Sequence, residues 1–377
     1  MTNALMQQVD SLKSLAQQQL DIAFSNAQKV MSFSEISNVR KIYIAGLGDS
    51  YAAALGLVKL FKKYGDICEV EVITPMHFTR FVKRNSNNFD KREPNSTLMI
   101  AISNGGESAR IIELVQKAKE MKLLTLAITN NPTSRVAQLS GKIMLLNLEE
   151  VSYAIVGVRS YLTMLFTLFA FILYFGRVRG SVSPLREERL KISVVQLFKQ
   201  YVEKYDEFKK TARYIAEEIV DNEIIDFIGD DESYASAYFS SAKFVECLGS
   251  LISVDDSENW CHINAYLKSE NSVPTFIFAN KHSLSYSRAV ETARQAVMMN
   301  RKTVVVGDVD KHDFNSTVII VALPECNENS WIHVFYEYIP VSMVVAYLQE
   351  MKNTKNFCTE IHLKNATTKS SKIEVVL

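Results

Sequence analysis

The chain has 377 residues, 47% of them hydrophobic and 22% charged, which is enough for two ordinary domains and excludes a disordered chain. Its 42 basic and 42 acidic residues cancel, so no strong positive field is available to hold nucleic acid or an anionic membrane surface. We therefore expect a small-molecule partner.

The five cysteines are scattered and form no Cys-x-x-Cys pair, so we expect no metal, no redox motif and no other cofactor. The N-terminal segment, residues 1–20, is polar and helical in pattern and lacks the basic start and apolar core of a secretory signal. These features favour a cytoplasmic protein with reduced thiols.

The first half alternates short apolar runs with amphipathic segments. Runs at 41–48, 67–75, 96–103 and 123–129 predict strands, and segments 50–65 and 109–122 predict helices. Strand, turn and helix in succession predict an α/β fold with a parallel sheet between helices, and with ligands beyond the carboxyl ends of the strands.

One stretch, Tyr161 to Phe175, is almost wholly apolar. It has about 15 residues, whereas a helix that crosses the hydrocarbon layer needs roughly 20. Arg159 and Arg177 also bracket it closely. We expect a helix buried between domains or subunits, and no membrane span.

The α/β pattern then restarts after a basic segment with Gly, Ser and Pro at 176–189. Strands are expected at 223–231, 272–280 and 302–310, and a helix at 233–249. The match of GDSYAAA (48–54) with DESYASA (231–237) indicates a duplicated unit. The expected limits are 1–34 for a helical segment, 35–180 and 181–350 for two domains, and 351–377 for a C-terminal tail.

The turn Ser103-Asn104-Gly105-Gly106-Glu107-Ser108 lies between a predicted strand and a helix start. A helix N-terminus offers free N–H groups and a partial charge of about +0.5, which favour an anion. Hydroxyls at 103 and 108 add donors, and the glycines allow close approach. An ordinary turn with Ser108 as the helix cap fits the spacing equally well, and no Gly-Lys-Ser/Thr follows to make a P-loop.

A dinucleotide site is an alternative at Gly46-Leu47-Gly48, with Glu69 and Glu71 some twenty residues onward. The third glycine of that motif would fall at Tyr51, whose side chain would crowd a pyrophosphate. The motif is therefore incomplete.

Three polar residues of the second half are open to two interpretations. Lys243 and Glu246 are three apart on a predicted helix and share a face, as a solvated ion pair commonly does. His262 lies in a polar segment expected to be a loop, where a lone histidine is more often a surface residue than a catalyst.

Taken together, residues 35–377 resemble the tandem sugar isomerase (SIS) domain family, which includes the isomerase half of glucosamine-fructose-6-phosphate synthase. The resemblance implies two flavodoxin-like three-layer sandwiches. The 103–108 turn looks like the family's Ser-Gln-Ser-Gly-Glu-Thr phosphate loop, with one hydroxyl lost at Gly105, and Asp49-Ser50 matches a Thr-Ser pair near the sugar. By resemblance, the phosphate-binding residues are Ser103, Asn104, Gly105 and Ser108.

The second half resembles the family at three further places. Residues 242–246 match Leu-Lys-Leu-Lys-Glu, His262 falls where the family has its histidine, and Lys369 begins a match to the closing Lys-Ser-Val-Thr-Val-Glu. The resemblance implies that Glu246 moves a proton between C1 and C2, a step that a positioned carboxylate accelerates about 10²–10⁴-fold. His262 would assist ring opening, Lys369 would bind the open-chain carbonyl or form a Schiff base with it, and Lys243 would orient.

The family histidine commonly comes from a neighbouring subunit, which implies a homodimer or higher oligomer. Three positions depart from the pattern: Ile263 follows the histidine, and Asn259 and Phe239 replace acids. We expect a phosphosugar isomerase, deaminase or deglycase acting on a sugar or amino sugar 6-phosphate, without a glutaminase domain. The alternative is a sugar-phosphate sensor without catalysis.

Overall fold

The computed structural model describes residues 3–66, 69–83, 96–153, 156–267, 273–326, 329–357, 373 and 375. They form two compact units. Unit 1 comprises Met1–Ser14, Val151–Arg159 and Ile192–Thr359, and unit 2 comprises Leu15–Glu150, Ser160–Lys191 and Glu360–Leu377. The units thus divide the chain at points other than the limits 34, 180 and 350 expected from the sequence.

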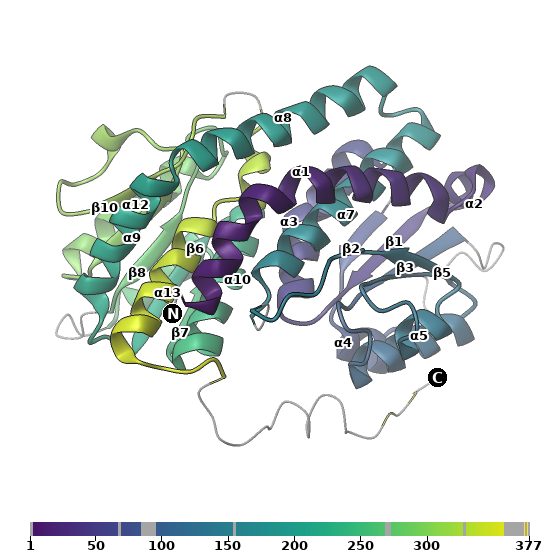
Figure 1. Cartoon of the computed structure of the whole chain (residues 1–377), viewed down its shortest axis with the longest axis horizontal. Helices are drawn as coiled ribbons and strands as arrows, with labels where there is room; N and C mark the ends of the chain where they lie inside the picture. The colour runs from purple at the N-terminus through teal and green to yellow at the C-terminus, as the bar shows by residue number, and fades with distance from the viewer. Residues whose placement is uncertain are drawn as a thin grey trace. The chain divides into compact units, whose positions relative to one another are not determined.

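Unit 2 contains a parallel five-stranded sheet in the order β2-β1-β3-β4-β5, flanked by helices (Figure 1). Every residue of β1 and β3 is buried, which explains their continuous apolar runs. The strands are β1 (Lys41–Ala45), β2 (Glu69–Val72), β3 (Thr97–Ile102), β4 (Leu124–Thr129) and β5 (Lys142–Leu145). The helices α2 to α6 are Phe33–Asn38, Asp49–Tyr64, Pro75–Phe81, Ala109–Glu120 and Arg135–Leu139.

Unit 1 contains a second parallel five-stranded sheet, in the order β10-β9-β8-β6-β7. Read from its β7 edge, this is the same winding as in unit 2, the flavodoxin-like order. The strands are β6 (Ile224–Gly229), β7 (Leu251–Asp255), β8 (Thr275–Phe278), β9 (Thr303–Gly307) and β10 (Ile319–Ala322). The helices α9 to α13 are Tyr205–Ile219, Glu232–Leu248, Ser257–Asn264, Tyr286–Met298 and Ile339–Lys352, with short 3-10 helices η2 (Lys311–Asp313) and η3 (Ser330–Phe335).

Three further helices each contribute residues to both units: α1 (Ala4–Val30), α7 (Val158–Arg179) and α8 (Pro184–Glu203). The two parallel sheets, each flanked by helices, confirm the expected α/β fold.

The turn after the first strand is built in the same way in both units. A Cβ on Gly46 would lie 2.6 Å from the carbonyl carbon of Ser50, and one on Gly229 would lie 2.5 Å from the carbonyl oxygen of Ser233. Both glycines therefore let the following helix begin against the end of its strand. Gly46 is accounted for by this internal contact, with no ligand needed to explain it.

The backbone repeats as well. The residue before α3, Gly48, has φ 55° and ψ −123°, and the residue before α10, Asp231, has φ 58° and ψ −126°. The expected duplication thus extends to single dihedral angles. Asp231 holds a conformation that suits glycine far better than a residue with a Cβ.

The most apolar helices belong to the core. By length and composition, α7 and the segment Ser330–Lys352 could each cross a membrane, but 83% and 94% of their apolar windows are buried inside the structure. Phe169 of α7 packs edge-to-face on Phe24, with ring centroids 5.9 Å apart, inside unit 2. The expectation of a buried helix is confirmed.

Candidate functional site

The 103–108 turn of unit 2 connects β3 to α5 and is held from one side by the end of β4 and by α6. The carbonyl oxygen of Asn104 accepts hydrogen bonds from the backbone N–H of Asn130 at 2.9 Å and from the Thr129 hydroxyl at 3.0 Å. The Glu107 carboxylate accepts from the backbone N–H and Nε of Arg135 at 2.9 and 2.7 Å. The loop is therefore a fixed structure.

Gly106 sets the shape of this turn. Its φ is +64°, and a Cβ there would lie 2.1 Å from Oγ of Ser134. A Cβ on the neighbouring Gly105 would point into open space, with no atom within 4 Å. Of these two glycines, only Gly106 is thus required by the fold.

Gly106→Ala is expected to lower the free energy of unfolding by about 2–4 kcal/mol, because a Cβ is disfavoured at this φ and clashes with Ser134. Urea denaturation followed by circular dichroism measures the loss. Gly105→Ala is the matched control and should change stability by less than about 0.5 kcal/mol. Equal losses in the two variants would contradict this account of the turn.

Hydrogen-bond donors of the turn remain unused. Ser108 stands at the N-cap position of α5, yet its side chain makes no cap hydrogen bond, and its buried Oγ has no partner among the described residues. Among the residues that the structure describes, the backbone N–H groups of Asn104, Gly105 and Ser108 also donate to no acceptor. Ser108 is therefore not the ordinary helix cap, and the turn retains donors for an anion at a helix N-terminus.

The expected sugar-side residues lie beside this turn. β1 and β3 are neighbours in the sheet, with Ala45 paired to Ala101, so the turns that follow them meet at the switch point where doubly wound sheets bind ligands. Asp49 and Ser50 open α3 there, and the Ser50 hydroxyl donates to the sulfur of Met164 at 3.4 Å. Unit 2 thus brings Asp49, Ser50 and the turn to one edge of its sheet.

The acids of the dinucleotide alternative are engaged elsewhere. Glu69 and Glu71 lie 3.5 and 3.9 Å from Nζ of Lys41, across the β1–β2 pair. Together with the internal role of Gly46, this leaves the dinucleotide interpretation without support.

In unit 1, Lys243 and Glu246 face each other on α10. Nζ of Lys243 lies 2.7 Å from Oε2 of Glu246 and 4.5 Å above the Phe239 ring. The Lys243 side chain is fully buried, whereas that of Glu246 is 26% exposed. The solvated-ion-pair interpretation is therefore wrong: the ammonium is held in the core by a carboxylate and an aromatic face, and the carboxylate reaches the surface.

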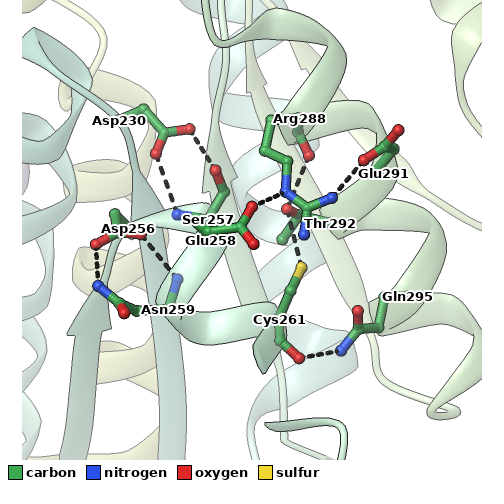
Figure 2. Close-up of polar contacts among 10 residues, drawn as sticks. All are labelled: Asp230, Asp256, Ser257, Glu258, Asn259, Cys261, Arg288, Glu291, Thr292 and Gln295. Carbon is green, nitrogen blue, oxygen red and sulfur yellow. Dashed lines mark hydrogen bonds and ion pairs between the residues drawn. The ribbon is translucent and has the colours of Figure 1, made fainter. Parts of the chain in front are cut away.

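His262 lies in the last turn of α11, so the expected loop is a helix. The helix forms because Asp256 caps it, accepting from the backbone N–H of Asn259 at 2.9 Å (Figure 2). The Asn259 amide also donates to Asp256 at 2.6 Å, so this residue serves the cap. The His262 side chain is exposed.

The expected site residues thus fall into separate groups. Unit 2 gathers Asp49, Ser50 and the 103–108 turn, and unit 1 pairs Lys243 with Glu246 and places His262 on another helix. Lys369 lies outside the described residues. Among the residues that are described, no group of three or more His, Cys, Asp or Glu side chains is placed to hold a metal ion.

Sequence patterns did not indicate a buried acid, Glu337, which precedes α13. Its Oε2 accepts from Nδ2 of Asn280 at 3.2 Å and from Oγ of Ser233 at 3.4 Å. Burial raises the pKa of Glu337 to about 7. The only available signal was a lone acid in a strongly apolar run.

A buried histidine lies one turn before it. Nδ1 of His333 is 3.1 Å from the Tyr201 hydroxyl, and the side chain is fully buried. Burial lowers the pKa of His333 to about 3. The core of unit 1 therefore holds two titratable groups whose neutral forms are favoured by burial.

The sequence is similar to proteins that contain SIS domains. Residues 35–175 match the sequence model of the SIS domain. Glutamine-fructose-6-phosphate aminotransferase (isomerizing) of Clostridium acetobutylicum is 24% identical over 216 residues, which cover 56% of this chain and 33% of the relative. The match thus spans about a third of that relative's length.

Solved structures share the fold over nearly the whole chain. The C-terminal domain of glucosamine-fructose-6-phosphate aminotransferase from Francisella tularensis has a TM-score of 0.74 at 15% identity and covers 95% of this chain and 98% of its own. Glucosamine-6-phosphate deaminase from Thermotoga maritima has a TM-score of 0.67 at 16% identity and covers 95% and 97%.

Proposed function

We propose that this chain, of which residues 35–175 match the SIS domain, is an enzyme that moves a proton between C1 and C2 of an open-chain sugar 6-phosphate. The observation that carries the proposal is the 103–108 turn, where the buried Ser108 hydroxyl and the backbone N–H groups of Asn104, Gly105 and Ser108 lack protein acceptors among the residues described. A phosphate group supplies the acceptors that such donors require.

The acid-base role falls to Glu246. A general base must be accessible to substrate and ionised, and this carboxylate is partly exposed and paired with the buried Lys243 ammonium. Lys243 holds the carboxylate in one orientation by donating a hydrogen bond to Oε2 at 2.7 Å. Among the described residues of unit 1, this is the pair best suited to proton transfer at carbon.

The remaining roles follow the family pattern. We assign ring opening to His262 and binding of the open-chain carbonyl to Lys369, in a homodimer or higher oligomer. Relatives named for amino transfer and for deamination of glucosamine 6-phosphate favour an amino sugar 6-phosphate as substrate. Isomerisation, deamination and deglycation all begin with the same proton transfer, so one exchange assay covers all three.

The test is C1 and C2 hydrogen exchange in D₂O, followed by NMR, with a panel of hexose, hexosamine and fructosamine 6-phosphates. Turnover or exchange with at least one member is expected. Saturable binding of a member by calorimetry with neither exchange nor turnover would instead favour the sensor, an alternative supported by the use of Asn259 in the α11 cap.

Ser108→Ala is expected to raise KM for the active sugar phosphate about 10- to 100-fold with a smaller change in kcat, because a hydrogen bond to a charged group is worth about 1.5–3 kcal/mol. Steady-state kinetics at fixed ionic strength gives both constants. Ser32→Ala, at the cap of α2 in the same unit, is the matched control, and its KM should match wild type. An unchanged KM in Ser108→Ala would remove the turn from the site.

A further inference from the structure

A buried ion pair lies beneath the helix that carries His262. Asp226 of β6 and Arg301, which precedes β9, form it with side chains only 9% and 2% exposed. Asp226 also accepts from Oγ of Ser253 at 2.8 Å and from the indole N–H of Trp260 at 3.0 Å. Each oxygen of the carboxylate is therefore used.

The same guanidinium reaches α11. Its Nη2 donates to Oδ1 of Asn264 at 3.0 Å, and its central carbon lies 5.0 Å from the centroid of the Trp260 ring. Arg301 thus joins the strand that carries Asp226 to two residues of α11. Trp260 and Asn264 each lie two residues from His262, one on either side.

Other contacts fix the remaining faces of α11 (Figure 2). The Asp230 carboxylate accepts from the backbone N–H of Ser257 at 3.1 Å and from its hydroxyl at 2.6 Å. On the opposite side, the Cys261 carbonyl accepts from the Gln295 amide of α12 at 2.9 Å. The helix is held along its length, although His262 itself is exposed.

A buried ion pair is a costly way to stabilise a core, because desolvation offsets most of its attraction and an apolar replacement is often as stable. The planar fork of arginine does what an apolar side chain does not: it fixes direction, by several hydrogen bonds at set angles. Here one of those bonds, from Nη2 to Asn264, ends on the helix that presents the histidine, and the others hold the guanidinium on the sheet through Asp226 and Thr275.

We propose that Arg301 is a positioning residue for His262, acting through its hydrogen bond to Asn264 and its contact with Trp260. The proposal rests on the proposed function, in which His262 assists ring opening.

The first test is a double-mutant cycle of Asn264→Ala with His262→Ala. Asn264→Ala removes the bond to Arg301 and leaves the ion pair intact, so kcat should fall about 5- to 20-fold with KM within about twofold. In the His262→Ala background, Asn264→Ala should have no further effect. An equal loss in both backgrounds, or no loss in either, overturns the proposal.

Two more variants complete the design. Arg301→Lys keeps the charge beside Asp226 but loses the fork, so it should reproduce the kcat loss of Asn264→Ala. Ser253→Ala removes a bond to Asp226 on the strand side, leaves both contacts of Arg301 with α11 in place, and should leave kcat unchanged. Wild-type kcat in Arg301→Lys, or a loss in Ser253→Ala equal to that of Asn264→Ala, counts against positioning.

A readout without turnover separates this proposal from the function on which it rests. The ring resonance of His262, assigned by its loss in His262→Ala, should shift in Asn264→Ala and stay in place in Ser253→Ala. If the wild-type protein shows no turnover, the proposed function fails, and an unmoved His262 resonance in Asn264→Ala then overturns the positioning role as well.

Discussion

Glu246→Gln is expected to lower kcat for C1/C2 proton exchange by about 10²–10⁴-fold, the usual contribution of a positioned acid-base group. The amide keeps the size of the carboxylate and still accepts a hydrogen bond from Lys243, but it accepts no proton from carbon. KM should change little, because the phosphate contacts proposed above involve other residues. The rate at which deuterium from D₂O replaces the proton signals of C1 and C2 measures the effect directly.

The control for Glu246→Gln is Glu217→Gln, an exposed acid of α9 in the same unit. It should retain wild-type kcat. A Glu246→Gln enzyme within about threefold of wild type would reassign the base, since such a change is far below the expected range.

Glu337→Gln is expected to raise the free energy of unfolding of unit 1 by up to about 3 kcal/mol at pH 8. The pKa of Glu337 is about 7 in the folded protein, against a reference value of 4.5. A raised pKa means that the stability contributed by the neutral acid is complete below pH 4.5 and is lost as the pH rises through 7. Glutamine stays neutral and does not lose it.

His333 makes the free energy of unfolding depend on pH in the opposite direction. Its pKa is about 3 in the folded protein, against a reference value of 6.5. The stability contributed by the neutral ring is therefore complete above pH 6.5 and is lost as the pH falls toward 3. Between pH 4.5 and 6.5 the two groups offset each other, so wild-type stability should vary little there on their account.

In Glu337→Gln, the pH dependence of stability that comes from His333 should no longer be offset. Its stability should rise with pH from 4.5 to 6.5 and then stay level, whereas wild type declines toward pH 8. Urea unfolding at pH 5, 6, 7 and 8 distinguishes the two curves, with Glu217→Gln again as the exposed control. A Glu337→Gln curve parallel to wild type at every pH would show that Glu337 is not neutral in the folded protein.

Most strands that the sequence predicted are buried ones; the exception is β2, an edge strand with one buried residue, which lies within the expected range 67–75. β1, β3, β6 and β9 are almost wholly buried and lie within the expected ranges, because burial on both faces leaves a continuous apolar run. The strands that escaped prediction, β5, β7 and β10, are edge strands of four or five residues with partly exposed side chains. A short edge strand carries neither a long apolar run nor strict alternation.

For the site, the position of the 103–108 turn between a strand and a helix start was predictable from sequence, whereas its unused donors were not. The burial of Lys243 was not, since it depends on Phe239 and on the packing around α10, and helical spacing looks the same on a solvated face. Glu337 and Arg301 were missed for a related reason. Their roles depend on partners far away in the chain, Asn280 for the first and Asp226 for the second.

The burial of both tryptophans has an optical consequence. The chain has two tryptophans, Trp260 and Trp331, and both belong to unit 1. Trp260 is fully buried and Trp331 is 7% exposed, so indole emission should shift to longer wavelength when unit 1 unfolds and should not register unit 2. Fluorescence and circular dichroism recorded on one sample would therefore show, without any label, whether the two halves of this duplicated chain melt together or in turn.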